Sequence, residues 1–585
     1  MNDDELKNKI INLFKENRFS DVLELTEKIG IEDRPAGLEN IIGISKYNKK
    51  DLTLKDLQDA LLCFERAFLK DKNSIHGFNG LLNIIKTGTK ACHVVNRFSE
   101  FLHKSVEYYL SIEKDYENNE EFLAAGHKLF SYLLDFDRLK QISKKILDSD
   151  LRSKYLRGVA VFENNYHKIW SQSDHLNIAL KNSKYFSKLQ VKDLDQIYYE
   201  ANNKINLGFI SPDFERNHST TYFLKDTIKY LIKNKFKISI FSIAKKNTKD
   251  QTQNELRSLS DAWFDVNDFN NQKLAELIQK EQINILVDLM GYTRAERLEL
   301  FHSRIAPKQV SWLAYCNTSG LDEMDFLIAD NNLILDSEEK LYSEKIIKLP
   351  HIWNSHSGFD FTRKLNELPS LNQNTFTFGS LNNFRKISDD VVETWSKILH
   401  EVPNSKLILK SSTACDNDSL LNKFKKFKVD HKIEILRKLD FLKKEDHLKV
   451  YNRIDLCLDT FPYNGVTTTF EALWMNVPVL VMKGYNFNSR CGESIMKNLG
   501  TNDLISENKE DYIINAIRLI NDKNALIDFM ENNGDKFNTK KKEPIFKLYG
   551  ALMYLELKKT PDFINANSIG RSRLRQTAQN AVLKR

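Results

Sequence analysis

The pattern of the sequence changes near residue 204. From there to about residue 360, and again from about residue 375, short β-branched and apolar runs alternate with segments of helical periodicity. Because buried strands that alternate with helices form parallel sheets, this pattern predicts two doubly wound α/β domains in tandem, facing one another across a cleft. The expected strands are 205–210, 237–243, 283–289, 309–313 and 326–329, then 375–379, 406–409, 432–436, 454–458 and 477–482.

Residues 1 to about 200 are different, because they contain almost no β-rich runs and their apolar residues recur at helical spacing. Ala60, Phe64 and Ala67 stand at i, i+4 and i+7. Small residues at this spacing let two helices approach closely while the aromatic ring fills the gap, as in the second helix of a tetratricopeptide repeat (TPR). A generic helical bundle is the alternative. Either arrangement makes this region all-α.

Composition narrows the class of protein. The 20 glycines and 10 prolines are about 5% of the chain, too few for a collagen-like or Pro/Gly-rich disordered protein. A net charge of +7 over 585 residues does not indicate a uniform nucleic-acid-binding surface, so no nucleic-acid partner is expected. Six cysteines without a CxxC pair favour a reducing compartment. With neither a signal peptide nor an apolar run of membrane-spanning length, we expect a cytoplasmic protein without a membrane span.

Polar clusters follow four of the expected strands, at the ends where open α/β sheets bind ligands. Any one of them alone is better explained as an ordinary solvated loop, but together they predict a ligand-binding cleft. The residues of interest in the four clusters are Asp213 and His218, Tyr292 and Thr293, Asn382 and Lys386, and Asp459 with residues 467–471.

The last cluster is the most informative. Gly465 permits a tight turn, and three threonines then open a helix whose first N–H groups have no intrahelical partner. Those groups and the helix dipole suit a diphosphate, and Glu471 stands one turn further on, where it can accept hydrogen bonds from a ribose. A simpler interpretation makes Thr467 or Thr468 an N-cap and Glu471 a dipole-complementing carboxylate. It explains one threonine and the glutamate, but not the whole run.

Five segments in order resemble the catalytic region of O-linked N-acetylglucosamine transferases, of the related SPINDLY-type O-fucosyltransferases and of their bacterial homologues. They are LGFISPDFERNHS, ILVDLMGYTRAERLELFHSRIAPKQVSWLAYCNTSG, FGSLNNFRKIS, VPNSKLILK and LCLDTFPYNGVTTTFEALWMNVPVLVM. The resemblance covers about residues 205–555. It implies a TPR-bearing protein with two facing Rossmann-like domains of the GT-B type, and an inverting glycosyl transfer that needs neither a metal nor another cofactor.

The resemblance also implies a domain organisation and partners. The expected parts are a TPR-like region (1–200), an N-terminal Rossmann-like catalytic domain (204–362), a C-terminal nucleotide-sugar-binding domain (374–558) and a basic tail (559–585). The expected partners are a nucleotide sugar and a protein acceptor, which the helical region would present. The oligomeric state stays open.

Site residues follow from the matched positions. His218 matches the histidine on the acceptor side, and Lys386 matches the lysine that contacts the donor diphosphate. The other donor-binding residues are Asn382, the nucleoside-holding Lys444 and His447, the pyrophosphate-binding Thr467 and Thr468, and the ribose-binding Glu471. The base that takes the acceptor proton is left open among His218, Asp213, a relayed water and the donor phosphate.

Three positions depart from the animal N-acetylglucosamine enzymes. Val466 stands in place of a histidine, Arg385 in place of a tyrosine and Asn383 in place of a glutamine. The expected function is transfer of a sugar to Ser/Thr hydroxyls of a protein, with UDP-GlcNAc as the preferred donor and GDP-fucose as the alternative. A scaffold with an inactive GT-B half is a further alternative, against which the retained donor-site residues argue.

Overall fold

A computed structural model describes residues 3–95, 98–194, 205–215, 218–233, 236–293, 296–354, 356–359, 363, 365–410, 415–437 and 443–533. Contacts divide the chain into two units. One joins residues 1–186 to 361–534, and the other joins 187–360 to 535–585. The expected basic tail, residues 559–585, lies outside the described residues.

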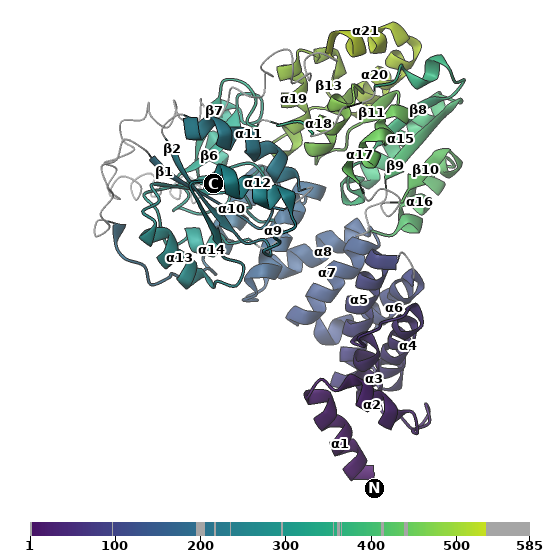
Figure 1. Ribbon diagram of the computed structural model, residues 1–585. Helices are drawn as coiled ribbons and strands as arrows, with labels where there is room; N and C mark the ends of the chain where they lie inside the picture. Colours follow the sequence, from purple (N-terminus) through teal and green to yellow (C-terminus); the bar gives the residue numbers. More distant parts are fainter. Residues whose placement is uncertain are drawn as a thin grey trace, which may run out of the picture. The chain divides into compact units, whose positions relative to one another are not determined.

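Helices are the only regular secondary structure in the described part of the first 186 residues (Figure 1). Several begin at a side-chain cap: Thr53 and Asp56 form a capping box at the start of α4, and Ser153 caps α9. The helices are α1 (Asp3–Lys15), α2 (Phe19–Thr26), α3 (Ala36–Tyr47), α4 (Leu54–Lys70), α5 (Ile75–Val95), α6 (Ser99–Tyr116), α7 (Glu120–Tyr132), α8 (Phe136–Asp148), α9 (Lys154–His167) and α10 (Gln172–Ser183).

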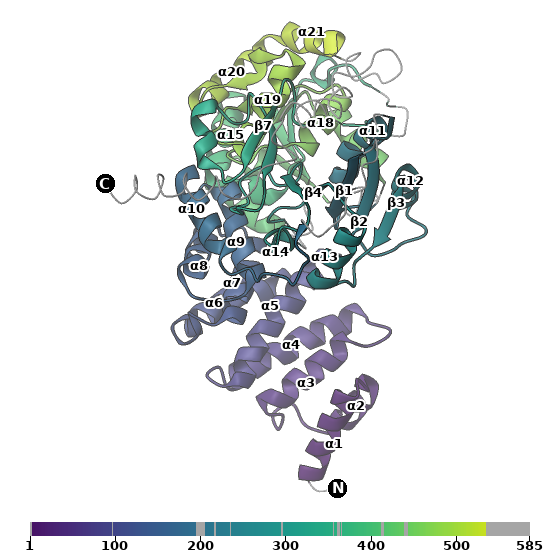
Figure 2. The ribbon, with the colours of Figure 1, turned by 90° about the vertical axis from the view of Figure 1, so that its left-hand side faces the viewer.

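Close packing of α3, α4 and α5 uses the small residues singled out in the sequence. Ala60, Phe64 and Ala67 are buried, and Figure 2 shows the three helices in successive layers. A Cβ atom on Gly43 would lie 2.5 Å from the Phe64 ring, and one on Gly80 would lie 2.7 Å from the Phe64 carbonyl oxygen. The all-α region is therefore confirmed, whereas its assignment as tetratricopeptide repeats stays a prediction.

The second unit contains a seven-stranded parallel sheet of order β3-β2-β1-β4-β5-β6-β7. Its strands are buried runs such as Leu207–Ile210, as expected of a sheet covered on both faces. The strands are β1 (Ile205–Ser211), β2 (Phe236–Ser242), β3 (Ala262–Asp265), β4 (Ile285–Asp288), β5 (Lys308–Ser311), β6 (Phe326–Asp330) and β7 (Lys345–Leu349). The helices are α11 (Ser219–Lys233), α12 (Gln251–Leu259), α13 (Asn271–Lys280) and α14 (Leu298–Phe301).

A six-stranded parallel sheet of order β10-β9-β8-β11-β12-β13 lies in the first unit, together with the helical region. The strands are β8 (Phe376–Ser380), β9 (Ser405–Lys410), β10 (Ile433–Leu436), β11 (Leu456–Leu458), β12 (Val479–Met482) and β13 (Ile505–Ser506). The helices are α15 (Asp389–Glu401), α16 (Asn417–Lys425), α17 (Lys444–Lys449), α18 (Thr467–Trp474), α19 (Cys491–Leu499), α20 (Lys509–Asn521) and α21 (Lys523–Asn533).

Both sheets reverse their strand order once, between β1 and β4 and between β8 and β11. All ten expected strands are present, with ends within about two residues of those expected, and β3, β7 and β13 were missed. Doubly wound sheets bind ligands beyond the carboxyl ends of the strands at such a reversal. Among the described residues, no helix is long and apolar enough to cross a membrane.

Candidate nucleotide-binding site

Three segments meet at the carboxyl ends of β8 and β11. Asn382, two residues after β8, donates from Nδ2 to the Oδ1 atom of Asp459 at 3.3 Å. The Thr468 hydroxyl in the first turn of α18 donates to Oδ1 of Asn382 at 2.9 Å. The structure thus brings Asn382 and Thr468 together, although 86 positions separate them in the sequence.

The turn before α18 requires a glycine for lack of space. Asp459 Oδ1 accepts hydrogen bonds from the backbone N–H groups of Thr460 at 2.9 Å and Gly465 at 2.7 Å. A Cβ atom on Gly465 would lie 2.4 Å from Oγ1 of Thr468 and 2.9 Å from the same Asp459 oxygen. The turn can therefore close only around glycine unless these groups move.

The residue that precedes α18 is Val466, so the interpretation of Thr467 or Thr468 as an N-cap is wrong. Both threonines lie inside the first turn, and the Val466 side chain has no atom with which to cap it. The first N–H groups of α18 are consequently left without a side-chain cap, which is the arrangement that binds anions at helix starts.

Lys386 lies over the loop that leads into α18. Its ammonium group donates to the carbonyl oxygen of Asn464 at 2.7 Å and lies 4.0 Å from the centre of the Tyr463 ring. The side chain is half-buried at the end of a 3-10 turn, Phe384–Lys386, that the Asn383 side chain caps. A positive charge is thereby held beside the loop between β11 and α18.

Asp459 is buried among these groups, with 2% of its surface exposed. Its Oδ2 atom has no hydrogen-bond partner among the described residues, whereas Oδ1 accepts the bonds described above. Burial raises the pKa of this carboxyl to about 7, even though the nearby Lys386 charge opposes the rise. Near neutral pH the group therefore titrates.

Glu471 forms the centre of a second cluster. Its Oε1 atom accepts a hydrogen bond from the Lys444 ammonium group. Its Oε2 atom lies 2.9 Å from Nε2 of His447 and accepts from the Tyr451 hydroxyl at 3.2 Å. Burial by itself would raise the pKa of Glu471, but the Lys444 charge, together with the hydrogen bonds from Lys444 and His447, outweighs it and holds that pKa well below its usual range.

Lys410 fixes the tautomer of His447. Its ammonium group lies 2.7 Å from Nδ1 of His447. Because an ammonium group can only donate, Nδ1 must accept, and a neutral ring then carries its proton on Nε2 and donates it to Glu471. Three predicted residues, Lys444, His447 and Glu471, are thus in contact. Sequence reasoning missed Lys410 and Tyr451. The only signals for them were that Lys410 ends β9 and that Tyr451 follows α17.

His218 and Asp213 lie together in the second unit, in the loop after β1. Nε2 of His218 lies 3.3 Å from Oδ1 of Asp213, and Nδ1 accepts from the Thr220 N–H at 3.4 Å. The histidine side chain is 39% exposed and the carboxylate 18%. These contacts suit an imidazole that is oriented by a carboxylate at the carboxyl end of a strand.

The loop after β4 holds its polar groups against other protein groups, whereas the sequence suggested that they face a ligand. Tyr292 is buried and its hydroxyl donates to the Ser319 carbonyl oxygen at 2.9 Å. Asp288 accepts hydrogen bonds from the N–H groups of Met290 and Gly291, and burial raises its pKa to about 6. Among the described residues, no group of three or more His, Cys, Asp or Glu side chains is arranged to hold a metal ion.

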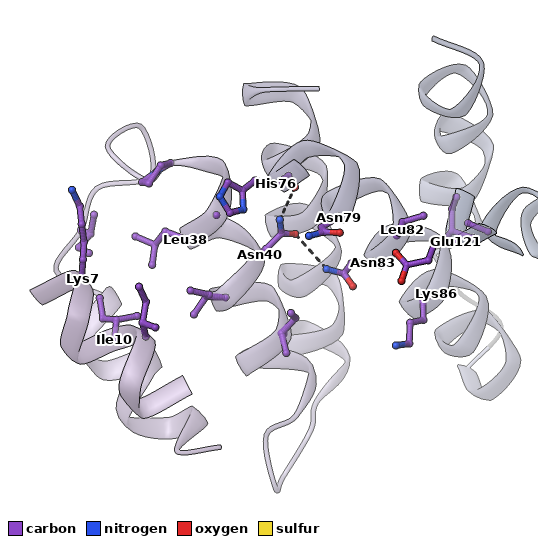
Figure 3. Close-up of a pocket in the computed structure, with 18 of the residues that line it drawn as sticks. Lys7, Ile10, Leu38, Asn40, His76, Asn79, Leu82, Asn83, Lys86 and Glu121 are labelled. Atoms are coloured by element: carbon purple, nitrogen blue, oxygen red, sulfur yellow. Dashed lines mark hydrogen bonds between the residues drawn. The ribbon is translucent and has the colours of Figure 1, made fainter. Parts of the chain in front are cut away.

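The helical region carries a groove of about 970 Å³. Three asparagines, Asn40, Asn79 and Asn83, lie at its middle, with Lys7 toward one end and Glu121 toward the other (Figure 3). Asn40 donates to the His76 carbonyl oxygen at 2.7 Å, and Asn83 donates to Asn40 at 3.4 Å. The apolar part of the lining includes Ile10, Ile11, Leu38, Ile41, Ile44 and Leu82.

Comparison with known proteins identifies the family. Residues 164–358 and 361–549 match the family described as glycosyl transferase family 41. The chain belongs to glycosyl transferase family 41. One solved structure, of a Thermobaculum terrenum O-GlcNAc transferase mutant, covers 86% of this family 41 chain and 94% of its own, with a TM-score of 0.73 and 22% identity. The expected fold class, a helical region followed by two Rossmann-like domains of the GT-B type, is confirmed.

Curated relatives of the family 41 chain include two kinds of plant protein. A probable UDP-N-acetylglucosamine–peptide N-acetylglucosaminyltransferase SPINDLY from Hordeum vulgare is 31% identical over 56% of this chain and 35% of its own length. A probable enzyme of the same description named SEC, from Arabidopsis thaliana, is 26% identical over 54% of this chain and 33% of its own. The chain therefore spans about a third of the length of these relatives.

Proposed function

We propose that this chain is an inverting glycosyltransferase that moves a sugar from a nucleoside diphosphate donor to Ser/Thr hydroxyls of a protein. The observation that carries the proposal is the meeting of Asn382, Lys386 and Thr468 at the strand-order reversal of the second sheet. An uncapped helix start and an ammonium group lie on either side of the loop from β11 to α18, and both favour an anion.

The reaction builds negative charge mainly on the leaving group. The acceptor oxygen attacks the anomeric carbon, the bond from that carbon to the β-phosphate oxygen breaks, and negative charge grows on the nucleoside diphosphate. Lys386 and the first N–H groups of α18 would stabilise this charge, an effect worth a few kcal/mol for each donor. In this proposal these groups do the work of a metal ion, so the reaction uses no cofactor.

The acceptor proton must go to a base during the attack. We assign His218 to the acceptor side of the reaction and Asp213 to the orientation of its ring. The contact between Nε2 of His218 and the Asp213 carboxylate supports this assignment, since a carboxylate both orients an imidazole and stabilises its protonated form. A relayed water and the donor phosphate are the competing acceptors of the proton. A His218→Ala variant that keeps full transfer activity would exclude the histidine.

The nucleoside would be held by the cluster around Glu471. Lys444 and His447 are already fixed by this buried carboxylate, so their orientation costs little when the nucleotide binds. Glu471 itself has both oxygens engaged by protein groups, and its contact with a ribose is proposed through the lone pairs that these bonds leave free.

UDP-GlcNAc is the donor that we prefer, because the relatives are named as UDP-N-acetylglucosamine enzymes. GDP-fucose is the second candidate. It is favoured by Val466, Arg385 and Asn383, which depart from the animal N-acetylglucosamine enzymes beside the proposed diphosphate.

The acceptor polypeptide would bind along the groove of the helical region. Asparagine amides can both donate to and accept from a peptide backbone, and the isoleucines and leucines beside them can cover apolar side chains. All six cysteines are buried and none is joined to another in a disulfide, which supports a cytoplasmic location. We propose no nucleic-acid partner.

Calorimetric titration of the purified chain with UDP and with GDP, in a metal-free buffer, tests the proposal. Binding of UDP supports a UDP-sugar donor, and preference for GDP supports the fucosyl donor. Binding of neither would overturn the transferase and favour a scaffold whose GT-B half is inactive.

A further inference from the structure

One buried charge of the helical region contacts the residue next to the proposed diphosphate-binding lysine. Glu163 on α9 is fully buried, and both of its carboxylate oxygens accept from Nη2 of Arg385, at 2.6 and 2.5 Å. Arg385 directly precedes Lys386 in the 3-10 turn after β8. Although 222 positions separate Glu163 from Arg385, the two side chains form an ion pair within one unit of the chain.

The same helix also reaches the other support of Lys386. The Arg385 guanidinium lies over the Tyr166 ring at 4.5 Å, and that ring packs edge-on against Tyr463 at 4.9 Å. Phe162, one turn earlier on α9, lies 6.3 Å from Tyr463. Since Tyr463 is the ring that the Lys386 ammonium faces, α9 contacts both the backbone neighbour of the lysine and its aromatic platform.

Glu163 is held firmly in this place. His127 on α7 and His167 on α9 each bring Nε2 within 3.3–3.4 Å of its oxygens. Burial by itself would raise the pKa of Glu163, but the Arg385 charge and the two histidines hold it well below its usual range, so the carboxylate is charged. Breaking such a buried pair from one side leaves the other charge uncompensated.

We propose that Glu163 is a positioning residue, which through Arg385 sets the place of Lys386 against the β-phosphate of the donor. The inference rests on the proposed function, because it needs a diphosphate at Lys386. It gives the helical region a second role besides acceptor binding, because α9 contacts Arg385 and Tyr463, the two residues beside Lys386 in the donor site. Arg385, one of the three residues that depart from the animal enzymes, is then the residue through which α9 acts.

The test measures how much the β-phosphate adds to binding. Affinities of UDP and UMP, and of GDP and GMP, are measured by calorimetry for the full chain, and the ratio of the monophosphate to the diphosphate dissociation constant is compared. We expect Lys386→Ala and Glu163→Gln each to lower this ratio about tenfold, with monophosphate binding little changed. A purely structural role of Glu163 would weaken both nucleotides equally.

Two further variants separate positioning from folding. Glu39→Gln breaks a matched pair in the same helical region, where Glu39 is buried and accepts two bonds from Arg66 at 2.8 and 3.0 Å, and we expect it to leave the ratio unchanged. The single variant Glu163→Gln leaves the Arg385 charge buried and unpaired. The double variant Glu163→Gln with Arg385→Met removes both buried charges, so the stability lost in the single variant is restored. We expect it to fold and still to show the lowered ratio.

The outcomes distinguish the two proposals. Binding of neither UDP nor GDP by the unaltered chain, or an unchanged ratio in Lys386→Ala, would overturn the diphosphate site and this inference with it. A lowered ratio in Lys386→Ala together with an unaltered ratio in Glu163→Gln and in the double variant would overturn this inference alone.

Discussion

The Thr468 hydroxyl donates to the Asn382 side chain at 2.9 Å, and this single bond joins the start of α18 to the loop after β8. Asn382 in turn donates to Asp459, which holds the Gly465 turn. Each of these hydrogen-bonded groups orients the next, so the proposed diphosphate site is formed before a ligand binds. Such preorganisation is what lets a site stabilise charge without rearranging during the reaction.

Thr468→Val removes the donor of that bond and keeps the shape of the side chain. We expect diphosphate affinity to fall about five- to tenfold, the equivalent of about 1 kcal/mol for a lost hydrogen bond. Calorimetry with UDP and GDP measures the change. Thr394→Val on α15, which loses only a bond to the Asp390 carbonyl oxygen, is the matched control. Equal affinities of the two variants would remove Thr468 from the site.

Lys386→Ala removes the charge that we place against the leaving group. We expect the transfer rate to fall about 100- to 1000-fold while the thermal unfolding temperature stays near that of the unaltered chain. The rate is measured with the sugar donor whose nucleotide binds. Lys397→Ala, which removes an exposed lysine paired only with Glu393, should transfer normally. Near-normal turnover in Lys386→Ala would contradict the role given to this lysine.

Glu471→Gln removes a buried carboxylate whose pKa is held low in the folded chain. Between its folded pKa and the ordinary value of about 4.3, the unfolded state binds more protons, so this contribution is fully present above that value and is lost as the pH falls below it. We expect the variant to be less stable by about 2–3 kcal/mol at pH 7. Urea unfolding at pH 7, 5 and 4 should show the difference narrowing only at the lowest pH. A difference that does not depend on pH would mean that the pKa is not lowered.

Asp459 should take up a proton when the nucleotide binds. Its pKa is about 7 without ligand, and a diphosphate brought next to it raises that pKa further, so the fraction protonated at pH 7 increases. We expect the apparent binding enthalpy of UDP or GDP at pH 7 to differ between HEPES and Tris buffers, which differ in ionisation enthalpy and contain no phosphate to compete for the site. The difference should vanish in Asp459→Asn. If the unaltered chain shows the same enthalpy in both buffers, the carboxyl does not titrate with binding.

Asn83→Ala tests the groove of the helical region. Asn83 donates only weakly, at 3.4 Å, to Asn40, so its removal should cost little stability. We expect KM for a protein acceptor to rise several-fold, while the affinity for UDP or GDP stays unchanged. The readout is transfer to a panel of cytoplasmic proteins at rising acceptor concentration. An unaltered KM would indicate that acceptors bind elsewhere.

The repeating strand pattern made most of the fold predictable. Nine of the ten expected strands are mostly buried, and the tenth, β10, still has three apolar residues of four, so the apolar content that marks them is local and strong. The three missed strands are short or partly exposed edge elements: β3 is half-buried along its length, β7 begins with an exposed lysine, and β13 has two residues. Pairing with a neighbour, rather than their own apolar content, makes them strands.

The candidate site was predictable where its residues follow a strand or start a helix. Asn382, Lys386, Thr467 and Thr468 fall in such places, and the structure gathers them at the carboxyl ends of β8 and β11. The Glu163–Arg385 pair could not be predicted, because no local pattern marks a lone glutamate on a helix as the partner of an arginine 222 positions away. The one signal in the sequence was Arg385 itself, which stands where the animal N-acetylglucosamine enzymes have a tyrosine.

The first unit is discontinuous, and this affects the order in which the chain can mature. During synthesis α9 emerges about 220 residues before Arg385, so the Glu163 carboxylate meets two histidines but no guanidinium until the intervening Rossmann-like domain has been made. Docking of the second sheet is then a late event that closes a long loop. A chain cut after α10 would keep that carboxylate without its arginine partner.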